Sequence, residues 1–187
     1  MTETANVLNG VDRDALNATL DAVRGRPELA QVTFTLGTNW GGGCRQTATT
    51  GEVRQAGNRV EERTARYTLE SDEPAALLGT DTAASPGEYV LQALAGCYAV
   101  TYAANAAVRG IELSSLRLDM EVDFDLQGFL GLDESVRPGA QEIRVTVHVE
   151  SPNTSREGLQ ELTDAVQRRS PIRDTLANAA RISTVLA

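Results

Sequence analysis

The chain has 187 residues, of which 41% are hydrophobic, so it can bury the core of an ordinary globular domain. Its formal net charge of −9 argues against nucleic acid or an anionic membrane surface as a partner, because both require a basic footprint. The first residues show no basic segment followed by an apolar one, so we expect no signal peptide. With only two cysteines, Cys44 and Cys97, we expect a cytoplasmic location and no disulfide framework.

The N-terminal half is expected to hold one helix and a meander of antiparallel strands. Apolar residues at helical spacing predict an amphipathic helix over residues 11–24, which Arg26-Pro27 ends. Alternation of apolar and polar residues predicts strands over 29–36, 45–50 and 60–69. A turn at 39–44 and a Gly51/Gly57 connection separate these strands, and residues 70–84 form a loop.

A long helix is predicted from Ser85 to Gly110. Ser85 and Glu88 form the S-x-x-E pattern of a capping box, and Gly110 suits the position just after the last helical turn. The twenty residues between Glu88 and Arg109 carry no charge and could in length span a bilayer. Polar residues interrupt them and alanine is only weakly hydrophobic, so we expect a buried core helix. A homodimer with two such helices between two sheets would bury them.

The C-terminal half predicts two strands followed by helices. Strict alternation indicates a strand over 113–126 and a partner strand over 143–149. Thr154 and Glu157 are expected to open a helix that ends near Arg169, and Ser170-Pro171 to begin a short one. Residues 182–186 are expected to form an edge strand. This order of elements favours an α+β fold over a doubly wound sheet.

Cys97 lies near the middle of the uncharged helix. A buried free cysteine often acts as a small hydrophobic residue. A reactive thiol would need a nearby cation and partial access for substrate, and mid-helix the dipole offers no help. The single His148 and two cysteines at unrelated spacings do not make a zinc site, so we expect no metal and no cofactor.

The stretch SDEPAALLGTDTAASPGEYVLQALAGCYAVT resembles the OsmC/Ohr family, whose members carry a Pro-x-Glu-Leu-Leu helix start leading into Ala-Gly-Cys. The later Ser-Pro-Ile-x-x-Thr-Leu sequence is also similar, so the resemblance runs from about Val32 onward. It implies a single OsmC-like domain over residues 29–187, with residues 1–28 as an N-terminal helical extension. It also implies an α+β fold with an antiparallel sheet and a long buried central helix, in an intertwined homodimer.

The resemblance implies a thiol peroxidase that reduces organic hydroperoxides. An attacking cysteine, here Cys97 by position, becomes a sulfenic acid, a second cysteine captures it as a disulfide, and an external thiol reductant resets the pair. Two of the family's elements are missing. Ser170 occupies the position of the resolving cysteine and cannot form a disulfide, and Gly87 stands where the hydroperoxide reductases have Glu.

The remaining elements match by position only. Glu88 matches the Glu that other branches of the family carry one residue later, although its capping box explains it without catalysis. Arg54 is the nearest match by spacing to the activating arginine, with Arg45 and Arg66 as rivals. Cys44 falls outside the family pattern and could resolve Cys97 only if the two Cα atoms came within ~7 Å.

Three hypotheses for the function stay open. In the first, the protein is a one-Cys hydroperoxide reductase that uses an external thiol. In the second, which the replacements at Gly87 and Ser170 motivate, a dimer binds a small apolar or thiol-reactive ligand near Cys97 without turnover. In the third, the dimer has a structural stress role and Cys97 is inert.

Overall fold

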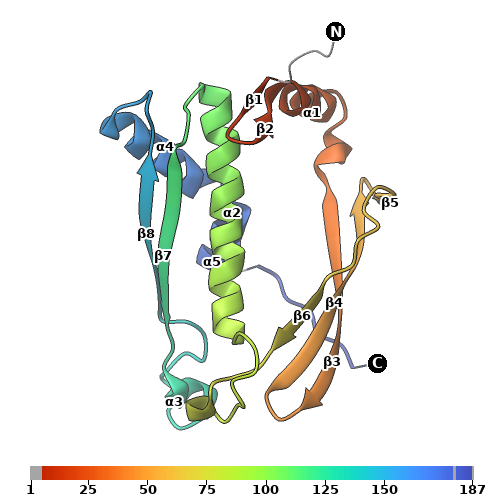
Figure 1. The fold of residues 1–187 in the computed structure, drawn as a ribbon. Coiled ribbons are helices and arrows are strands. Elements are labelled where there is room, and N and C mark those ends of the chain that lie inside the picture. The colour runs from red at the N-terminus through yellow and green to blue at the C-terminus, as the bar shows by residue number, and fades with distance from the viewer. Residues whose placement is uncertain (1–5, 179, 187) are drawn as a thin grey trace. The chain divides into compact units, whose positions relative to one another are not determined.

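The computed structural model describes residues 6–178 and 180–186 (Figure 1). The chain divides into two compact units, one formed by Asp14–Tyr89 and the other by Met1–Arg13 together with Val90–Ala187. Each unit combines helical segments with antiparallel strands. The predicted α+β class is therefore confirmed.

The unit Asp14–Tyr89 is built on a long hairpin to which two short strands are added. Strands β5 and β6 both pair with β4 antiparallel, which leaves β3 at the edge of the sheet. The elements are α1 (Arg13–Gly25), a 3₁₀ turn (Pro27–Ala30), β3 (Val32–Gly42), β4 (Arg45–Gln55), β5 (Asn58–Arg59), β6 (Thr68–Ser71) and a second 3₁₀ turn (Ala75–Leu77). The helix predicted over 11–24 is therefore present, but it begins two residues later, since Val11–Asp12 form β2, and ends one residue later.

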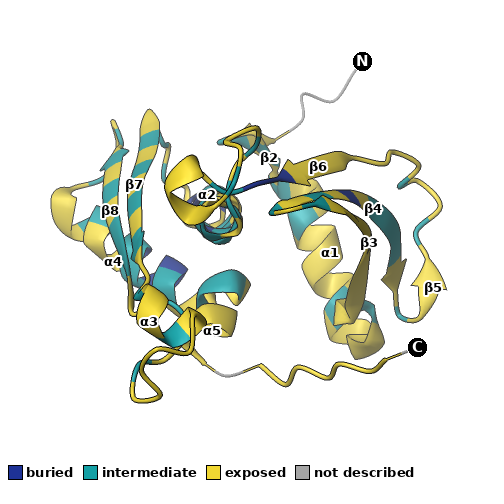
Figure 2. Cartoon of the chain, turned by 90° about the horizontal axis from the view of Figure 1, so that it is seen from below, coloured by how far each residue is buried: buried dark blue, intermediate teal, exposed yellow. Residues whose placement is uncertain are grey.

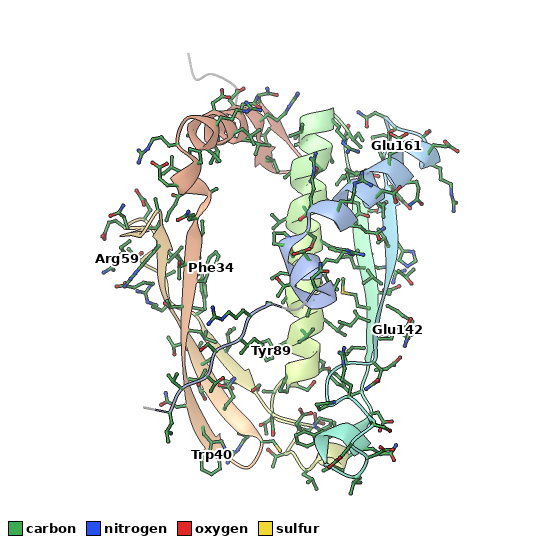
Figure 3. The ribbon with its side chains drawn as sticks, turned by 180° about the vertical axis from the view of Figure 1, so that it is seen from behind. Phe34, Trp40, Arg59, Tyr89, Glu142 and Glu161 are labelled. Atoms are coloured by element: carbon green, nitrogen blue, oxygen red, sulfur yellow. The ribbon has the colours of Figure 1, made fainter. Side chains whose placement is uncertain are left out.

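The hairpin strands are longer than the sequence pattern predicts. Strand β4 continues through Gly51, where the prediction places a connection, because a Cβ there would lie 2.2 Å from Thr35 Oγ1 and glycine has none. Thr35 instead donates a hydrogen bond to the carbonyl of Glu52, at 2.9 Å. At the other end the strands reach the positive-φ residues Gly42 and Gly43, and Trp40 lies near this tip (Figure 3).

The strand predicted over 60–69 is wrong for most of its length. Only Thr68–Ser71 pairs with β4, and Asn58–Arg59 forms a two-residue strand before it. Between them the backbone turns, because the N–H of Arg63 bonds the carbonyl of Val60 at 3.2 Å. Local turn hydrogen bonds here replace the ladder that alternation suggested.

A buried carboxylate holds the loop between β6 and the long helix α2 (Pro86–Arg109). Asp72 is 1% exposed and accepts hydrogen bonds from the hydroxyls of Thr80 and Thr82, at 2.6 and 2.9 Å. It also accepts from the backbone N–H groups of Glu73, Thr80 and Thr82. One side chain thus satisfies donors across the whole loop that leads into α2.

The ends of α2 form as the sequence predicts. Ser85 N–H donates to Glu88 Oε2 at 2.7 Å, and Glu88 N–H donates to Ser85 Oγ at 3.2 Å, which is the reciprocal pair of a capping box. Gly110 has a φ of 69°, the left-handed conformation that glycine adopts readily after a helix.

The other unit packs part of α2 against a hairpin and two helices. Strands β7 and β8 pair antiparallel along their whole length, from Ser115 opposite Glu150 to Asp123 opposite Glu142. In Figure 1 this hairpin runs alongside α2. The further elements are β1 (Val7–Leu8), β2 (Val11–Asp12), β7 (Ser115–Asp123), α3 (Leu126–Phe129), β8 (Glu142–Glu150), α4 (Arg156–Arg169) and α5 (Pro171–Ala177).

Residues near the N-terminus belong to this second unit. The Asn9 side chain accepts a hydrogen bond from the N–H of Leu113 at 2.8 Å and donates to the carbonyl of Ile111 at 2.9 Å. One amide therefore holds the connection between α2 and β7.

Two predictions for the C-terminal half need correction. The N-cap of α4 is Ser155, whose hydroxyl accepts from the N–H of Gly158 at 3.3 Å, and not Thr154. Residues 182–186 are not a strand, because in the described part of the chain no neighbouring strand pairs with them. Their apolar side chains are exposed, at 87% for Ile182 and 85% for Val185.

The core of the second unit lies on one face of α2. Leu94, Tyr98, Tyr102 and Ala106 recur every four residues and pack with Leu162 and Val166 of α4. Alternate residues of β7 and β8 cover this cluster from the sheet, and Tyr102 donates a 2.8 Å hydrogen bond to the hydroxyl of Thr163.

Other positions of α2 lie outside this core. Ala93 and Gly96 are exposed and Val100 is 70% exposed. Figure 2 shows this contrast as buried and exposed colours along the same helix. Among the described residues, no helix combines the length and the apolar character that crossing a membrane requires.

We expect Asp72→Asn to destabilise the protein at neutral pH and to flatten the acid limb of its stability profile. The Thr80 hydroxyl, followed by the N–H of Glu73 and the donors of Thr82, holds the pKa of Asp72 well below its ordinary value of 3.8. The folded state therefore binds this proton more weakly than the unfolded chain does. This stabilisation is complete above the unfolded pKa and is lost as pH falls through the lower folded pKa.

Urea unfolding between about pH 7 and about pH 2.5 measures the effect. Asp81→Asn is the matched control, since Asp81 lies in the same loop at a φ of 57° that asparagine tolerates. If the free energy of unfolding of Asp72→Asn and of the natural protein changed with pH in parallel, Asp72 would not be the source of the acid dependence.

Candidate functional site

Cys97 lies on α2 in contact with a buried serine. Its side chain is partly exposed, and both cysteines of the chain are free thiols. The Ser170 hydroxyl donates a hydrogen bond to Cys97 Sγ across 3.1 Å. The structure thus brings together two residues that are 73 positions apart and that the sequence analysis singled out.

Ser170 is held in place by the ends of two helices. Its N–H bonds the carbonyl of Val166 at 2.9 Å and closes α4, and its hydroxyl accepts from the N–H of Arg173 at 3.3 Å and caps α5. The residue is 1% exposed. A side chain with so many constraints presents its oxygen to Cys97 in one geometry.

A chain of side-chain hydrogen bonds ties the cysteine-bearing turn to α4. Thr101 donates to the carbonyl of Cys97 at 2.7 Å, and Asn105 donates to the carbonyl of Thr101 at 2.8 Å. Arg169, next to Ser170, donates to the Asn105 side-chain oxygen at 2.9 Å. Two contacts therefore fix the position of α2 against the end of α4. One is the hydrogen bond between Arg169 and Asn105, and the other is that between Ser170 and Cys97.

Arg173 and Tyr98 also belong to this site, and the sequence analysis missed both. Burial raises the pKa of Tyr98, and the charge and hydrogen bond of the Arg173 guanidinium oppose that rise. The Tyr98 hydroxyl is therefore protonated at neutral pH beside a cation. The sequence feature that could have pointed to Arg173 is its position three residues after the helix cap Ser170. Its backbone N–H donates the capping hydrogen bond to the Ser170 hydroxyl.

A cavity of about 520 Å³ lies beside these residues. Tyr98 and Arg173 contribute to its wall, while Cys97 does not line it. It lies between the N-terminal half of α2, α5 and the first half of β8. Two hydrogen bonds through the Ser170 hydroxyl link Cys97 to Arg173, which lines the cavity.

Other predicted site residues lie in the Asp14–Tyr89 unit. Arg54 is on β4 with its guanidinium 3.5 Å from Glu52, and Arg45 begins the same strand. Cys44 donates a weak hydrogen bond to the carbonyl of Leu78 at 3.5 Å. A role for any of them at Cys97 stays a prediction.

Glu88 and His148 have structural partners. Glu88 accepts the capping hydrogen bond of Ser85, and His148 Nε2 lies 2.9 Å from Asp119 Oδ2 on the exposed side of the β7–β8 hairpin. Within residues 6–178 and 180–186, no group of three or more His, Cys, Asp or Glu side chains is placed to hold a metal ion.

We expect Ser170→Ala to slow the alkylation of Cys97 by iodoacetamide about tenfold at neutral pH, because a hydroxyl hydrogen bond stabilises the reactive thiolate. Loss of the α5 cap should also cost about 1 kcal/mol of stability. The rate is measured by mass spectrometry in a Cys44→Ser background.

Ser155→Ala is the matched control, because it removes the cap of α4 but does not touch Cys97. It should reproduce the loss of stability and leave the alkylation rate unchanged. Equal rates for all three proteins would show that the Ser170 hydroxyl does not act on the thiol.

The fold is similar to those of several proteins of known structure. An OsmC-like protein from Mycoplasma pneumoniae has a similar structure, with a TM-score of 0.57 and 20% identity over 79% of this chain and 89% of that one. An organic hydroperoxide resistance protein OsmC from Legionella pneumophila gives a TM-score of 0.53 and 14% identity, over 77% and 88% of the two chains.

An organic hydroperoxide resistance protein from Elizabethkingia anophelis, with thiocyanate bound, gives a TM-score of 0.53 and 13% identity over 79% and 89% of the chains. No curated protein matches this chain significantly by sequence. The family model described as OsmC-like protein matches residues 79–185, more than half of the chain and including both Cys97 and Ser170. The chain therefore belongs to the OsmC-like protein family.

Proposed function

We propose that this protein reduces organic hydroperoxides in a one-Cys manner at Cys97, with an external thiol as reductant. The observation that carries the proposal is the 3.1 Å contact between Cys97 Sγ and the Ser170 hydroxyl. Ser170, which by the resemblance occupies the position of the family's second cysteine, donates a hydrogen bond to the thiol and cannot form a disulfide. Similar structures from Legionella pneumophila and Elizabethkingia anophelis are described as organic hydroperoxide resistance proteins.

The first step transfers one oxygen from the peroxide to sulfur. The Cys97 thiolate attacks the terminal oxygen of ROOH, the O–O bond breaks, and RO⁻ leaves and takes a proton to become ROH. Sulfur is oxidised to Cys97–SOH and the peroxide is reduced to the alcohol. The Ser170 hydroxyl donates to the sulfur before the attack.

Two molecules of external thiol restore the enzyme. The first attacks the sulfenic sulfur, forms a mixed disulfide with Cys97 and releases water. The second attacks the mixed disulfide, so that Cys97 leaves as a thiolate and the reductant leaves as its own disulfide. The cycle needs no cofactor and no second protein cysteine.

The functional unit in this proposal is a homodimer. Two apolar surfaces of the chain are exposed, one on α2 around Gly96 and Val100 and one on β3, where Phe34 is 75% exposed. A Cβ added at Gly96 would meet no atom within 4 Å, so a partner helix can approach α2 closely there. A second copy would supply the cover that α2 lacks within one chain.

An alternative function is ligand binding near Cys97 without turnover. The cavity of about 520 Å³ beside Tyr98 and Arg173 favours it, because that volume suits a small molecule. Native mass spectrometry of the purified protein distinguishes the two functions. A stoichiometric ligand without peroxide turnover would favour binding alone.

The natural protein should consume cumene hydroperoxide in the presence of dithiothreitol, and Cys97→Ser should lose at least about 100-fold in rate because the nucleophile is gone. Cys44→Ser is the matched cysteine control and should keep the natural rate. Consumption of peroxide is followed at steady state, and an unchanged rate in Cys97→Ser would overturn the proposal.

The product of a single turnover gives a second arm of the same test. In the Cys44→Ser background, peroxide should add one oxygen to Cys97, which dimedone then traps. In Ser170→Cys/Cys44→Ser the same treatment should give an intramolecular disulfide instead, since the new sulfur would stand in contact with Cys97. A disulfide-free product in that variant would contradict the placement of residue 170 as the resolving position.

Val100→Asp should convert the dimer to monomers, because it places a charge on the exposed face of α2 that the partner covers. Leu132→Asp is the matched control, since the two side chains are 70% and 72% exposed within the chain. Sedimentation equilibrium measures the masses. Dimers in both variants, or monomers of the natural protein, would refute the homodimer.

A further inference from the structure

The cavity beside Cys97 has an apolar wall over most of its surface. It lies in the unit that holds the thiol, between α2, α5 and the β7–β8 hairpin. Its larger aliphatic and phenyl side chains are those of Val90, Leu94, Phe124, Ile143, Val145 and Leu176. A volume of about 520 Å³ falls in the range of small-molecule sites, so a ligand with an apolar body of moderate length fits it.

The cavity wall contains more positively than negatively charged side chains. Arg137, Arg173 and Glu142 line the cavity, and Glu142 lies at the start of β8 (Figure 3). The carboxylate of Glu142 is already paired, because Arg144 donates to it at 2.7 Å. Among the residues that the structure describes, neither Arg137 nor Arg173 forms an ion pair.

Two arginines without an acidic partner stand out in a chain with a net charge of −9, in which acidic residues outnumber basic ones. Arg137 donates one hydrogen bond, to the carbonyl of Ala140 at 2.8 Å, and keeps its other donors free for a ligand. Arg173 is half-buried against the Tyr98 hydroxyl. A guanidinium at an apolar wall attracts an anion more strongly than one in open water does.

The cavity also lies next to the reactive centre. The backbone N–H of Arg173 bonds the Ser170 hydroxyl, which in turn bonds Cys97 Sγ. Ser170 therefore connects the cysteine to a residue that lines the cavity.

We propose that this cavity binds organic anions, with a carboxylate on the Arg173 guanidinium and an apolar body along Leu94, Ile143 and Leu176. The Tyr98 hydroxyl, protonated at neutral pH, adds a second donor for the carboxylate, and Arg137 attracts it at the mouth. Binding itself does not depend on turnover. Only the kinetic arm of the test below rests on the proposed function.

Calorimetry on Cys97→Ser tests binding in a protein that cannot turn over. Octanoate should bind at least about tenfold more tightly than 1-octanol, because the alcohol has the same apolar body without the charge. Arg173→Ala should lose at least about tenfold in octanoate affinity, and Arg173→Lys should recover part of it. Both variants keep the backbone N–H that caps α5.

Arg117→Ala is the control for the loss of one positive charge, since Arg117 lies on β7 beside Asp119 and away from the cavity wall. It should leave octanoate binding unchanged. Equal affinity for octanoate and octanol, or unchanged octanoate affinity in Arg173→Ala, would overturn the proposal.

A kinetic arm separates this inference from the proposed function. In the natural protein, octanoate should raise the KM for cumene hydroperoxide and leave kcat unchanged. Octanoate binding without any peroxide turnover would refute the proposed function and support the anion site. Turnover without octanoate binding would refute the anion site and leave the proposed function intact.

Discussion

The packing of one face of α2 against α4 is the interaction on which the site depends. Tyr102 and Leu162 are fully buried in this contact, and the Tyr102 hydroxyl bonds Thr163 within it. Because side chains in such a core interdigitate closely, the two helices have one register. That register brings the C-terminal end of α4, and therefore Ser170, to the cysteine on α2.

Ser170 combines structural and chemical roles that are hard to separate. It ends α4, caps α5 and donates to Cys97, so the residue that organises the helix junction also forms a hydrogen bond with the thiol. A hydroxyl suits all three roles because it donates and accepts at once. The same property makes the site different from a two-cysteine site, in which the second sulfur would form a covalent bond.

One arginine pairs with three acidic groups at one end of the β7–β8 hairpin. Arg144 lies between the carboxylates of Glu121, Asp123 and Glu142, and these hydrogen bonds, led by that of Asp123, raise the pKa of the arginine. Glu142, the acidic side chain at the cavity, is therefore ion-paired, whereas Arg137 and Arg173 of the same wall form no ion pair among the described residues. The proposed anion site depends on these two arginines and not on the net charge of the chain.

Features that depend on neighbouring residues could be predicted from the sequence. The capping box at Ser85, the glycine at the end of α2, the β7–β8 alternation and the family pattern around Cys97 all follow from short-range chemistry and appear as predicted. Predictions failed where pairing partners decide the outcome. Strand β4 continues through Gly51, residues 60–69 are mostly a turn and loop, and residues 182–186 have no partner strand among the described residues.

The surroundings of the thiol, by contrast, depend on contacts between distant segments. The sequence marked Cys97 and Ser170 by position, but their hydrogen bond, the Tyr98–Arg173 pair and the cavity all join segments that are far apart in the chain. Such contacts arise from the way an apolar helix face packs, and no local pattern encodes them. The sequence therefore identified the cysteine, and the fold supplied its hydrogen-bond donor, Ser170.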